Sequence, residues 1–431
     1  MSRLNIMVLH RLGNPRLAPS FLCHHVFALR DAFPEHNYLY HDTELPLPDY
    51  VRDIAFDAIV LDVTFLWIRW LAEATFLNIR ETYSFVRDSG GLKLAFPQDE
   101  YDCNELLDDW MCDWRVDRVF SVISSHWDVL YPRYHRQGSI RLAYTGYVDP
   151  TLLAKEGRPF DLRRIDIGYR ARRLPPYFGR IGETKWAIGE RVENPAKRAG
   201  LTTDILLGDQ GTLLGPQWLD FLGDCRFTLG ANSGSSLLDP RGDIQRRVRA
   251  YLNAHPAASF EEVEANCFPG LDGRHSFTAI SPRVLEAGLL GSCQVLVEGD
   301  YSGIVRPWEH YIPIRADATD FPQVLEAMRD RQLVDRLISN CRETILDSKE
   351  LHYRHKAATV IGLIESHRVG SGPATDAEAV QRTIRRYEED MRQTYAKHWR
   401  RQSFRRKLSR FVDRSPTVSR LARTVWSGLR G

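Results

Sequence analysis

The sequence lacks the features that mark membrane-spanning, secreted and zinc-binding chains. Its most apolar long stretch, residues 56–79, contains four charged side chains, and such charges are costly at the centre of a bilayer. The apolar run at residues 4–9 is shorter than the core of a secretory signal. The seven cysteines are scattered and never spaced C-x-x-C, which disfavours a zinc site or a disulfide framework. We therefore expect a reduced, cytoplasmic protein without a membrane span.

An excess of charge of one sign is also missing from the chain as a whole, but the charge is unevenly distributed. The chain sums to only +2, yet residues 376–431 hold 15 Lys and Arg against 6 Asp and Glu. This end therefore carries +9, and residues 1–375 carry −7. A mildly acidic body argues against a nucleic-acid groove, and a cationic end predicts a segment that meets an anionic surface.

Short apolar runs alternate with stretches of helical periodicity over the first 150 residues, which predicts repeated βα units. Such units form a parallel, doubly wound sheet. Strands are expected at residues 4–9, 37–40, 58–63, 92–96 and 119–123, and helices at 21–33, 71–86, 104–112 and 126–134.

Glycine, proline and turn residues between Thr145 and Pro159 predict a domain boundary, after which a second α/β region begins. Its strands are expected at residues 165–169, 227–230, 293–297 and 311–314, and its helices at 182–199, 261–266, 282–287, 321–329 and 333–347. We predict an α/β fold with two doubly wound, Rossmann-like domains that face a cleft. These are residues 1–155 and 156–370, followed by a basic amphipathic helical tail over 371–431. Clefts between domains are common ligand sites.

The most informative segment begins at Ile280-Ser281-Pro282. Ser281 is a natural N-cap and Pro282 a natural first helical residue, so a helix begins here whose positive end suits a diphosphate. Glu286 lies just over one turn into this helix, placed to accept hydrogen bonds from two vicinal ribose hydroxyls. The alternative is an ordinary amphipathic helix with a solvated glutamate.

The pattern Glu286-Ala287-Gly288-Leu289-Leu290-Gly291, followed by a strand and a glycine-containing loop, resembles the C-terminal half of GT-B glycosyltransferases of the family-1-like group. The resemblance implies that the second domain holds a nucleotide-sugar donor, with Glu286 on its ribose, and that the first domain holds the acceptor. Many such enzymes carry a second acidic residue eight positions earlier, where this chain has Thr278. This departure leaves the retaining or inverting outcome open.

Four arginines lie in residues 169–180, after the first expected strand of the second domain. Guanidinium groups match phosphate oxygens, and the resemblance implies basic residues here, with no metal and no cofactor besides the donor. The alternative is a solvated basic loop. Small residues at 230–236 could approach a phosphate or form a plain turn. The predicted donor-binding residues are Arg170, Arg172, Lys185, Ser281, Arg283, Glu286, Tyr301, Ser302 and Gly303.

Two acids, Asp99 and Glu100, follow an expected strand of the first domain and are candidates for the catalytic base that takes the acceptor's proton. The alternative is a helix N-terminal cap ahead of Asn104. Asn14 and His24, near the first βα loop, are candidates for acceptor binding, although a helical histidine can also be purely structural.

Residues 400–411 place Phe404, Leu408 and Phe411 on one helical face among arginines, and Ser415-Pro416 begins a second short helix. Basic amphipathic helices lie in the headgroup region of anionic membranes, although docking to another protein is an alternative.

We therefore expect a glycosyltransferase of the hexosyl-transferring class, active in polysaccharide biosynthesis and independent of metal. It would move a sugar from a nucleotide donor to a lipid-linked surface glycan. It would sit peripherally at the inner face of the cell membrane through residues 398–431, without a nucleic-acid partner. The alternatives are a non-catalytic nucleotide- or glycan-binding scaffold and a GT-B-like sugar-nucleotide epimerase.

Overall fold

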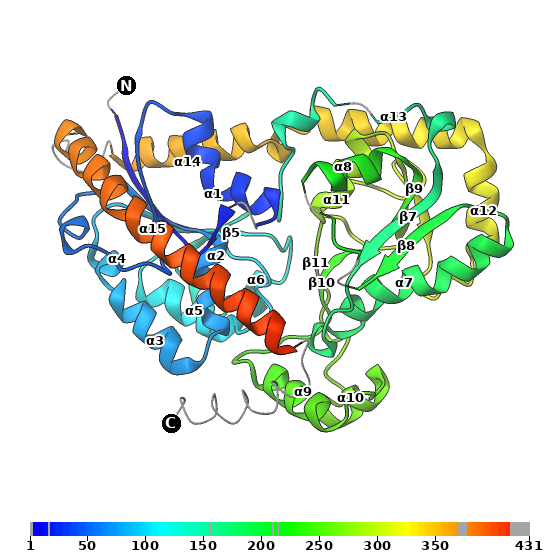
Figure 1. The fold of residues 1–431 in the computed structure, drawn as a ribbon, viewed down its shortest axis with the longest axis horizontal. Helices are drawn as coiled ribbons and strands as arrows, with labels where there is room; N and C mark the ends of the chain where they lie inside the picture. Colours follow the sequence, from blue (N-terminus) through cyan, green and yellow to red (C-terminus); the bar gives the residue numbers. More distant parts are fainter. Residues whose placement is uncertain are drawn as a thin grey trace.

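The computed structural model describes residues 3–15, 18–155, 157–208, 211–213, 215–368 and 377–413, of which 399 and 401–413 are described by their backbone alone. Two α/β lobes stand side by side, and the last helix runs across the first of them (Figure 1). The predicted fold class, two doubly wound parallel sheets, is confirmed.

The first lobe is built on a six-stranded parallel sheet of order β2-β1-β3-β4-β5-β6. Its central strands are almost entirely buried because helices cover both faces. The predicted strands recur within a few residues, and β6 was not predicted. The elements are β1 (Asn5–His10), α1 (Ser20–Ala32), β2 (Asn37–Asp42), β3 (Ala58–Leu61), α2 (Val63–Leu66), α3 (Glu73–Thr82), α4 (Phe85–Asp88), β4 (Leu92–Ala95), α5 (Asn104–Asp113), β5 (Arg118–Ser121), α6 (Trp127–Leu130) and β6 (Ser139–Leu142).

The second lobe repeats this plan with a five-stranded parallel sheet of order β13-β12-β9-β7-β8 and adds a short antiparallel pair, β10 and β11. Strand β8 and helices α8 and α9 were not predicted. The elements are β7 (Ile165–Ala171), α7 (Gly179–Arg198), β8 (Thr203–Leu207), α8 (Pro216–Gly223), β9 (Cys225–Gly230), β10 (Ser233–Ser235), α9 (Asp243–Ala254), α10 (Phe260–Cys267), β11 (Phe277–Ala279), α11 (Pro282–Leu289), β12 (Cys293–Val297), β13 (Ile312–Ile314), α12 (Phe321–Arg329) and α13 (Arg331–Asp347).

The chain then returns to the first lobe through α14 (Tyr353–Arg368) and α15 (Ala377–Asp413). Helix α14 packs along α1, where the Tyr353 hydroxyl donates to the Phe21 carbonyl at 3.0 Å. Although α14 lies within the predicted second domain (156–370), its apolar residues complete the core beneath the first sheet.

Helix α15 also belongs in part to the first lobe. Val380, Ile384, Tyr387 and Met391 recur at helical spacing and are buried in its core. The Tyr387 hydroxyl lies 2.7 Å from His41 Nδ1. This part of the predicted tail (371–431) is therefore packed, whereas the amphipathic face predicted at 404–411 and the helix after Pro416 lie outside the described side chains.

A second junction joins the lobes directly. Cys103 N–H donates to the Asp239 carbonyl at 2.7 Å, and Asp239 N–H donates to the Tyr101 carbonyl at 2.9 Å. The Tyr101 ring stacks on Phe277 of β11, with centroids 6.0 Å apart. The segment that connects β10 to β11, together with β11 itself, therefore joins the second lobe to the first.

Candidate functional site

A cavity of about 450 Å³ lies between the lobes, mostly on the second. One side of it is lined by the carboxyl end of β7 and by Ser233 of β10, which follows β9. The strand order of the second sheet reverses between β7 and β9. Doubly wound sheets bind ligands at this position because the connections leave in opposite directions and open a crevice. Ser20, Phe21 and Thr145 of the first lobe close the other side.

Helix α11 begins at this cavity. Ser281 and Pro282 line it, as the Ser-Pro start predicts, and the Ser281 hydroxyl does not cap its own helix. The N-terminal end of the helix therefore lies at the cavity, and its partial positive charge favours an anion there.

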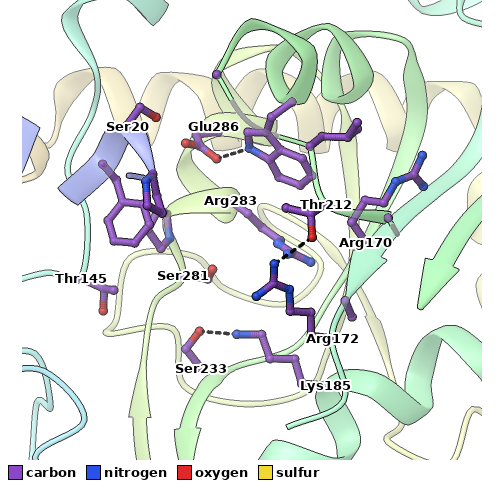
Figure 2. Close-up of a pocket in the computed structure, with 18 of the residues that line it drawn as sticks. Ser20, Thr145, Arg170, Arg172, Lys185, Thr212, Ser233, Ser281, Arg283 and Glu286 are labelled. Carbon is purple, nitrogen blue, oxygen red and sulfur yellow. Dashed lines mark hydrogen bonds between the residues drawn. The ribbon is translucent and has the colours of Figure 1, made fainter. Parts of the chain in front are cut away.

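Glu286 projects from the second turn of α11 into the same space (Figure 2). One of its oxygens, Oε2, accepts a hydrogen bond from Trp218 Nε1 at 2.7 Å. Burial raises the pKa of Glu286, while the bond from Trp218 and the charge of Arg283 lower it. The carboxylate therefore stands beside the start of α11 with acceptor capacity left over.

Three cationic side chains, Arg172, Lys185 and Arg283, line the cavity together with Glu286. The Arg172 guanidinium donates to Thr212 Oγ1 at 2.9 Å, and Lys185 Nζ donates to Ser233 Oγ at 2.9 Å (Figure 2). Burial, followed by the charge of Arg283, lowers the pKa of Lys185 to about 8. A cationic cavity of this size suits a diphosphate.

Arg170 also lines the cavity, and it forms an ion pair with Asp204. It donates to the Asp204 carboxylate at 2.7 Å, and its guanidinium stacks on Phe221 at 4.0 Å. In Figure 2 the Arg170 side chain points away from Arg172, although both are predicted donor-binding residues.

The structure does not bring Tyr301, Ser302 and Gly303 into the cavity. Tyr301 is fully buried and donates to the Val297 carbonyl at 2.6 Å. Ser302 Oγ accepts from Ile280 N–H at 3.2 Å, and Gly303 is exposed. The loop after β12 folds back onto Tyr311 because the two tyrosine rings pack at 5.5 Å.

The two candidate bases have opposite surroundings. Glu100 is fully buried, accepts hydrogen bonds from Tyr131 and Val122, and has its pKa raised to about 7 by burial. Asp99 is half-buried, with a left-handed backbone (φ 48°), and its carboxylate accepts from the Tyr101 hydroxyl at 2.6 Å. Its charge acts on Lys185 across the cleft, so Asp99 is the acid of the two that is near the cavity.

The candidate acceptor residues lie outside the cavity lining. Asn14 is half-buried in the loop after β1. The His24 ring nitrogen Nδ1 lies 3.3 Å from Asp149 Oδ2, and the ring packs edge-on against Tyr353. His24 thus contacts the connections between the lobes.

Sequence reasoning missed several cavity residues, chiefly Trp218 of α8 and the loop residues Gly208, Gly211, Thr212, Leu213 and Gly215. The loop follows β8, a strand that was not predicted. Its glycines at 208, 211 and 215 were the available signal, since clustered glycines mark a loop and loops often carry binding residues.

Within the described residues, no three His, Cys, Asp or Glu side chains gather as a metal ion would require. No described helix is both long and apolar enough to cross a bilayer. All seven cysteines are free thiols.

No protein family and no curated protein matches this sequence. Solved structures do match in fold. An α-glucosyltransferase bound to UDP and a 13-mer DNA superposes with a TM-score of 0.51 at 11% identity, covering 85% of this chain and 100% of that chain. An α-glucosyltransferase in complex with UDP-glucose and DNA containing an abasic site superposes with a TM-score of 0.51 at 10% identity. This match covers 84% of this chain and 100% of that chain. HepE of Anabaena in complex with UDP and glucose superposes with a TM-score of 0.48 at 10% identity, covering 84% of this chain and 100% of that chain. The likeness to the two α-glucosyltransferase structures confirms the GT-B fold.

Proposed function

We propose that this chain is a glycosyltransferase that binds a nucleotide-sugar on its second lobe and transfers the sugar to an acceptor held by the first lobe. The observation that carries the proposal is one cavity that is lined by the start of α11, Glu286, Arg172, Lys185 and Arg283. The GT-B neighbours were solved with UDP or UDP-glucose, which supports a uridine diphosphate donor.

The parts of the donor follow from the charges. Glu286 accepts hydrogen bonds from the ribose hydroxyls. The positive N-terminal end of α11, with Arg172, Lys185 and Arg283, holds the diphosphate. These fixed cations stabilise the negative charge that develops on the leaving group, so the reaction needs no metal and no further cofactor.

In the transfer step, the bond between the anomeric carbon and the β-phosphate oxygen breaks, and its electron pair leaves with the nucleoside diphosphate. The acceptor hydroxyl oxygen bonds the anomeric carbon and gives its proton to Asp99. Glu100 is fully buried in the first lobe and does not reach the acceptor, so Asp99 is the base in this proposal. Ser20, Phe21 and Thr145 help to exclude water, so that transfer competes with hydrolysis.

The acceptor in this proposal is a lipid-linked surface glycan, reached from the cytoplasmic side of the cell membrane through residues 398–431. The +9 charge of residues 376–431 supports this location. The α-glucosyltransferase neighbours contain DNA, but the −7 charge of residues 1–375 disfavours a nucleic-acid acceptor here.

Calorimetry with UDP tests the donor site. We expect Glu286→Ala to weaken UDP binding about 100-fold, because a bond to a charged group and its preorganised geometry are lost together. Glu190→Ala, an exposed position on α7, is the matched control. Unchanged UDP affinity in the Glu286 variant contradicts the assignment.

Turnover tests the reaction. A transferase consumes UDP-sugar in proportion to acceptor, an epimerase does so without acceptor, and a scaffold does neither. We expect Asp99→Asn to lower kcat about 100-fold while UDP affinity changes far less. Duplex DNA, offered beside lipid-linked glycan, should remain unglycosylated.

Membrane attachment is tested separately. Removing residues 398–431 keeps the packed part of α15 and should release the protein from anionic vesicles. Persistent vesicle binding would count against the location proposed here.

A further inference from the structure

Trp218 connects two helices at the cavity wall. It lies in the first turn of α8, and its Nε1–H donates to Glu286 Oε2 on α11 at 2.7 Å (Figure 2). Within the described residues, this indole is the only hydrogen-bond partner of the Glu286 side chain, and no ion pair among those residues includes its carboxylate.

The charged and titratable groups that act on Glu286 are few. Arg283 lies on the same helix, Asp149 approaches from the connection between the lobes, and Tyr353 comes from the start of α14. Burial raises the pKa of Glu286, and the largest opposing influence is the hydrogen bond from Trp218. The ionised carboxylate therefore depends on this indole more than on any cation.

The same ring also holds a cation. The Arg283 guanidinium lies 5.3 Å from the Trp218 centroid and 5.3 Å from the Tyr169 centroid. Two aromatic rings on separate elements thus restrict Arg283, and one of them simultaneously holds Glu286.

We propose that Trp218 is a positioning residue that holds Glu286 Oε2, so that Oε1 accepts hydrogen bonds from the ribose diol and the site selects ribonucleotides over 2′-deoxyribonucleotides. This inference rests on the proposed function, in which Glu286 meets the ribose. The terminal torsion of a glutamate is broad, so a carboxylate without a fixed partner samples many orientations. A protonated carboxyl group would also offer a donor where the diol needs acceptors.

Trp218→Phe tests the inference because it keeps an aromatic ring and removes the N–H donor. Trp186→Phe is the matched control, since Trp186 contacts Arg173 outside the cavity lining. We expect Trp218→Phe to bind UDP about ten-fold more weakly at pH 7, while its affinity for 2′-deoxy-UDP changes little. The acidic pH at which UDP binding fails should also move upward in this variant.

An equal loss for both nucleotides would overturn the inference, because it would mean that the ring acts by packing alone. An unchanged UDP affinity and pH profile would overturn it as well. Trp186→Phe should match the wild type with both nucleotides.

A ligand-free readout separates this inference from the proposed function. The Trp218 indole resonance, assigned by its absence in Trp218→Phe, should move with pH in the wild type and stay constant in Glu286→Gln. If the wild type binds no UDP, the proposed function and the ribose selectivity fail, although a pH-dependent resonance still supports the hold on Glu286. A wild-type indole resonance that does not change with pH contradicts the hydrogen bond between Trp218 and Glu286.

Discussion

Numbered along each lobe, the first five strands of both sheets follow the same order, 2-1-3-4-5. The carboxyl ends of the two sheets differ, because one is filled by side chains and the other borders a cavity. In the first lobe, the reversal point between β1 and β3 is filled: His25 Nδ1 lies 2.9 Å from Asp62 Oδ2, and Lys356 Nζ donates to the His25 carbonyl at 3.3 Å. In the second lobe, the equivalent point between β7 and β9 is the cavity. The strand order therefore creates a possible ligand site in each lobe. Side chains fill the site in the first lobe and leave a cavity in the second.

Burial explains why the filled position is not a second binding site. His25 and Asp62 are each about 3% exposed, and burial lowers the pKa of Lys356 to about 7. Lys356 lies over the rings of Phe96 and Tyr147, at 4.6 and 5.5 Å. These groups stabilise the packing of α14 on the first lobe.

The largest effect should come from breaking the filled position. Lys356→Ala removes a buried cation beside Asp62 and leaves a void, so we expect the free energy of unfolding to fall by about 3 to 5 kcal/mol. Chemical denaturation measures this loss. The exposed Lys349→Ala should cost less than about 0.5 kcal/mol, and a similarly small loss for Lys356→Ala would show that the cluster is not structural.

The buried carboxyl group of Glu100 should make the free energy of unfolding depend on pH. Burial raises the pKa of Glu100 from 4.5 to about 7, so the folded state holds the proton more tightly than the unfolded state. The stability from this group is present below pH 4.5 and is lost as the pH rises to about 7, by about 3 kcal/mol. Glu100→Gln should remove this part of the slope, and parallel stability curves for variant and wild type would contradict the assignment.

In the open position, removal of one cation should lower activity more than stability. Lys185→Ala should reduce kcat/KM about 100-fold, because a fixed charge at the leaving diphosphate is lost. Lys155→Ala, which breaks an exposed pair with Asp220, is the control. If both variants lose activity equally, the cavity does not bind the diphosphate through Lys185.

The smallest expected effect is a change of UDP affinity with pH. Because burial lowers the pKa of Lys185 to about 8, this cation loses its charge above that pH. We expect UDP to bind about ten-fold more weakly at pH 9 than at pH 7. Lys185→Arg stays charged and should flatten the profile, whereas a profile that is already flat in the wild type would argue against a phosphate contact.

Sequence reasoning predicted the buried strands well because their apolar runs are continuous. Strand β12, Cys293–Val297, was predicted with its observed bounds, whereas edge strand β8 was missed since only Ile205 of its residues is buried. The packed face of α15 was present as a helical spacing of Val380, Ile384 and Tyr387, but the surrounding charge favoured a free tail.

The site was predictable where one local pattern defines it. Ser281 and Glu286 belong to a single helix start, and the structure places both at the cavity. Tyr301 could not be placed, because its burial depends on Tyr311 and on how the intervening loop closes. Trp218 reaches Glu286 from another helix, a contact that no spacing along the chain encodes.

The return of α15 to the first lobe has a consequence for biosynthesis. The core around β2 lacks Val380, Ile384, Tyr387 and Met391 until the final helix has left the ribosome, whereas the second sheet and its own helices, residues 165–347, are contiguous. The half of the protein that is translated first is thus completed last.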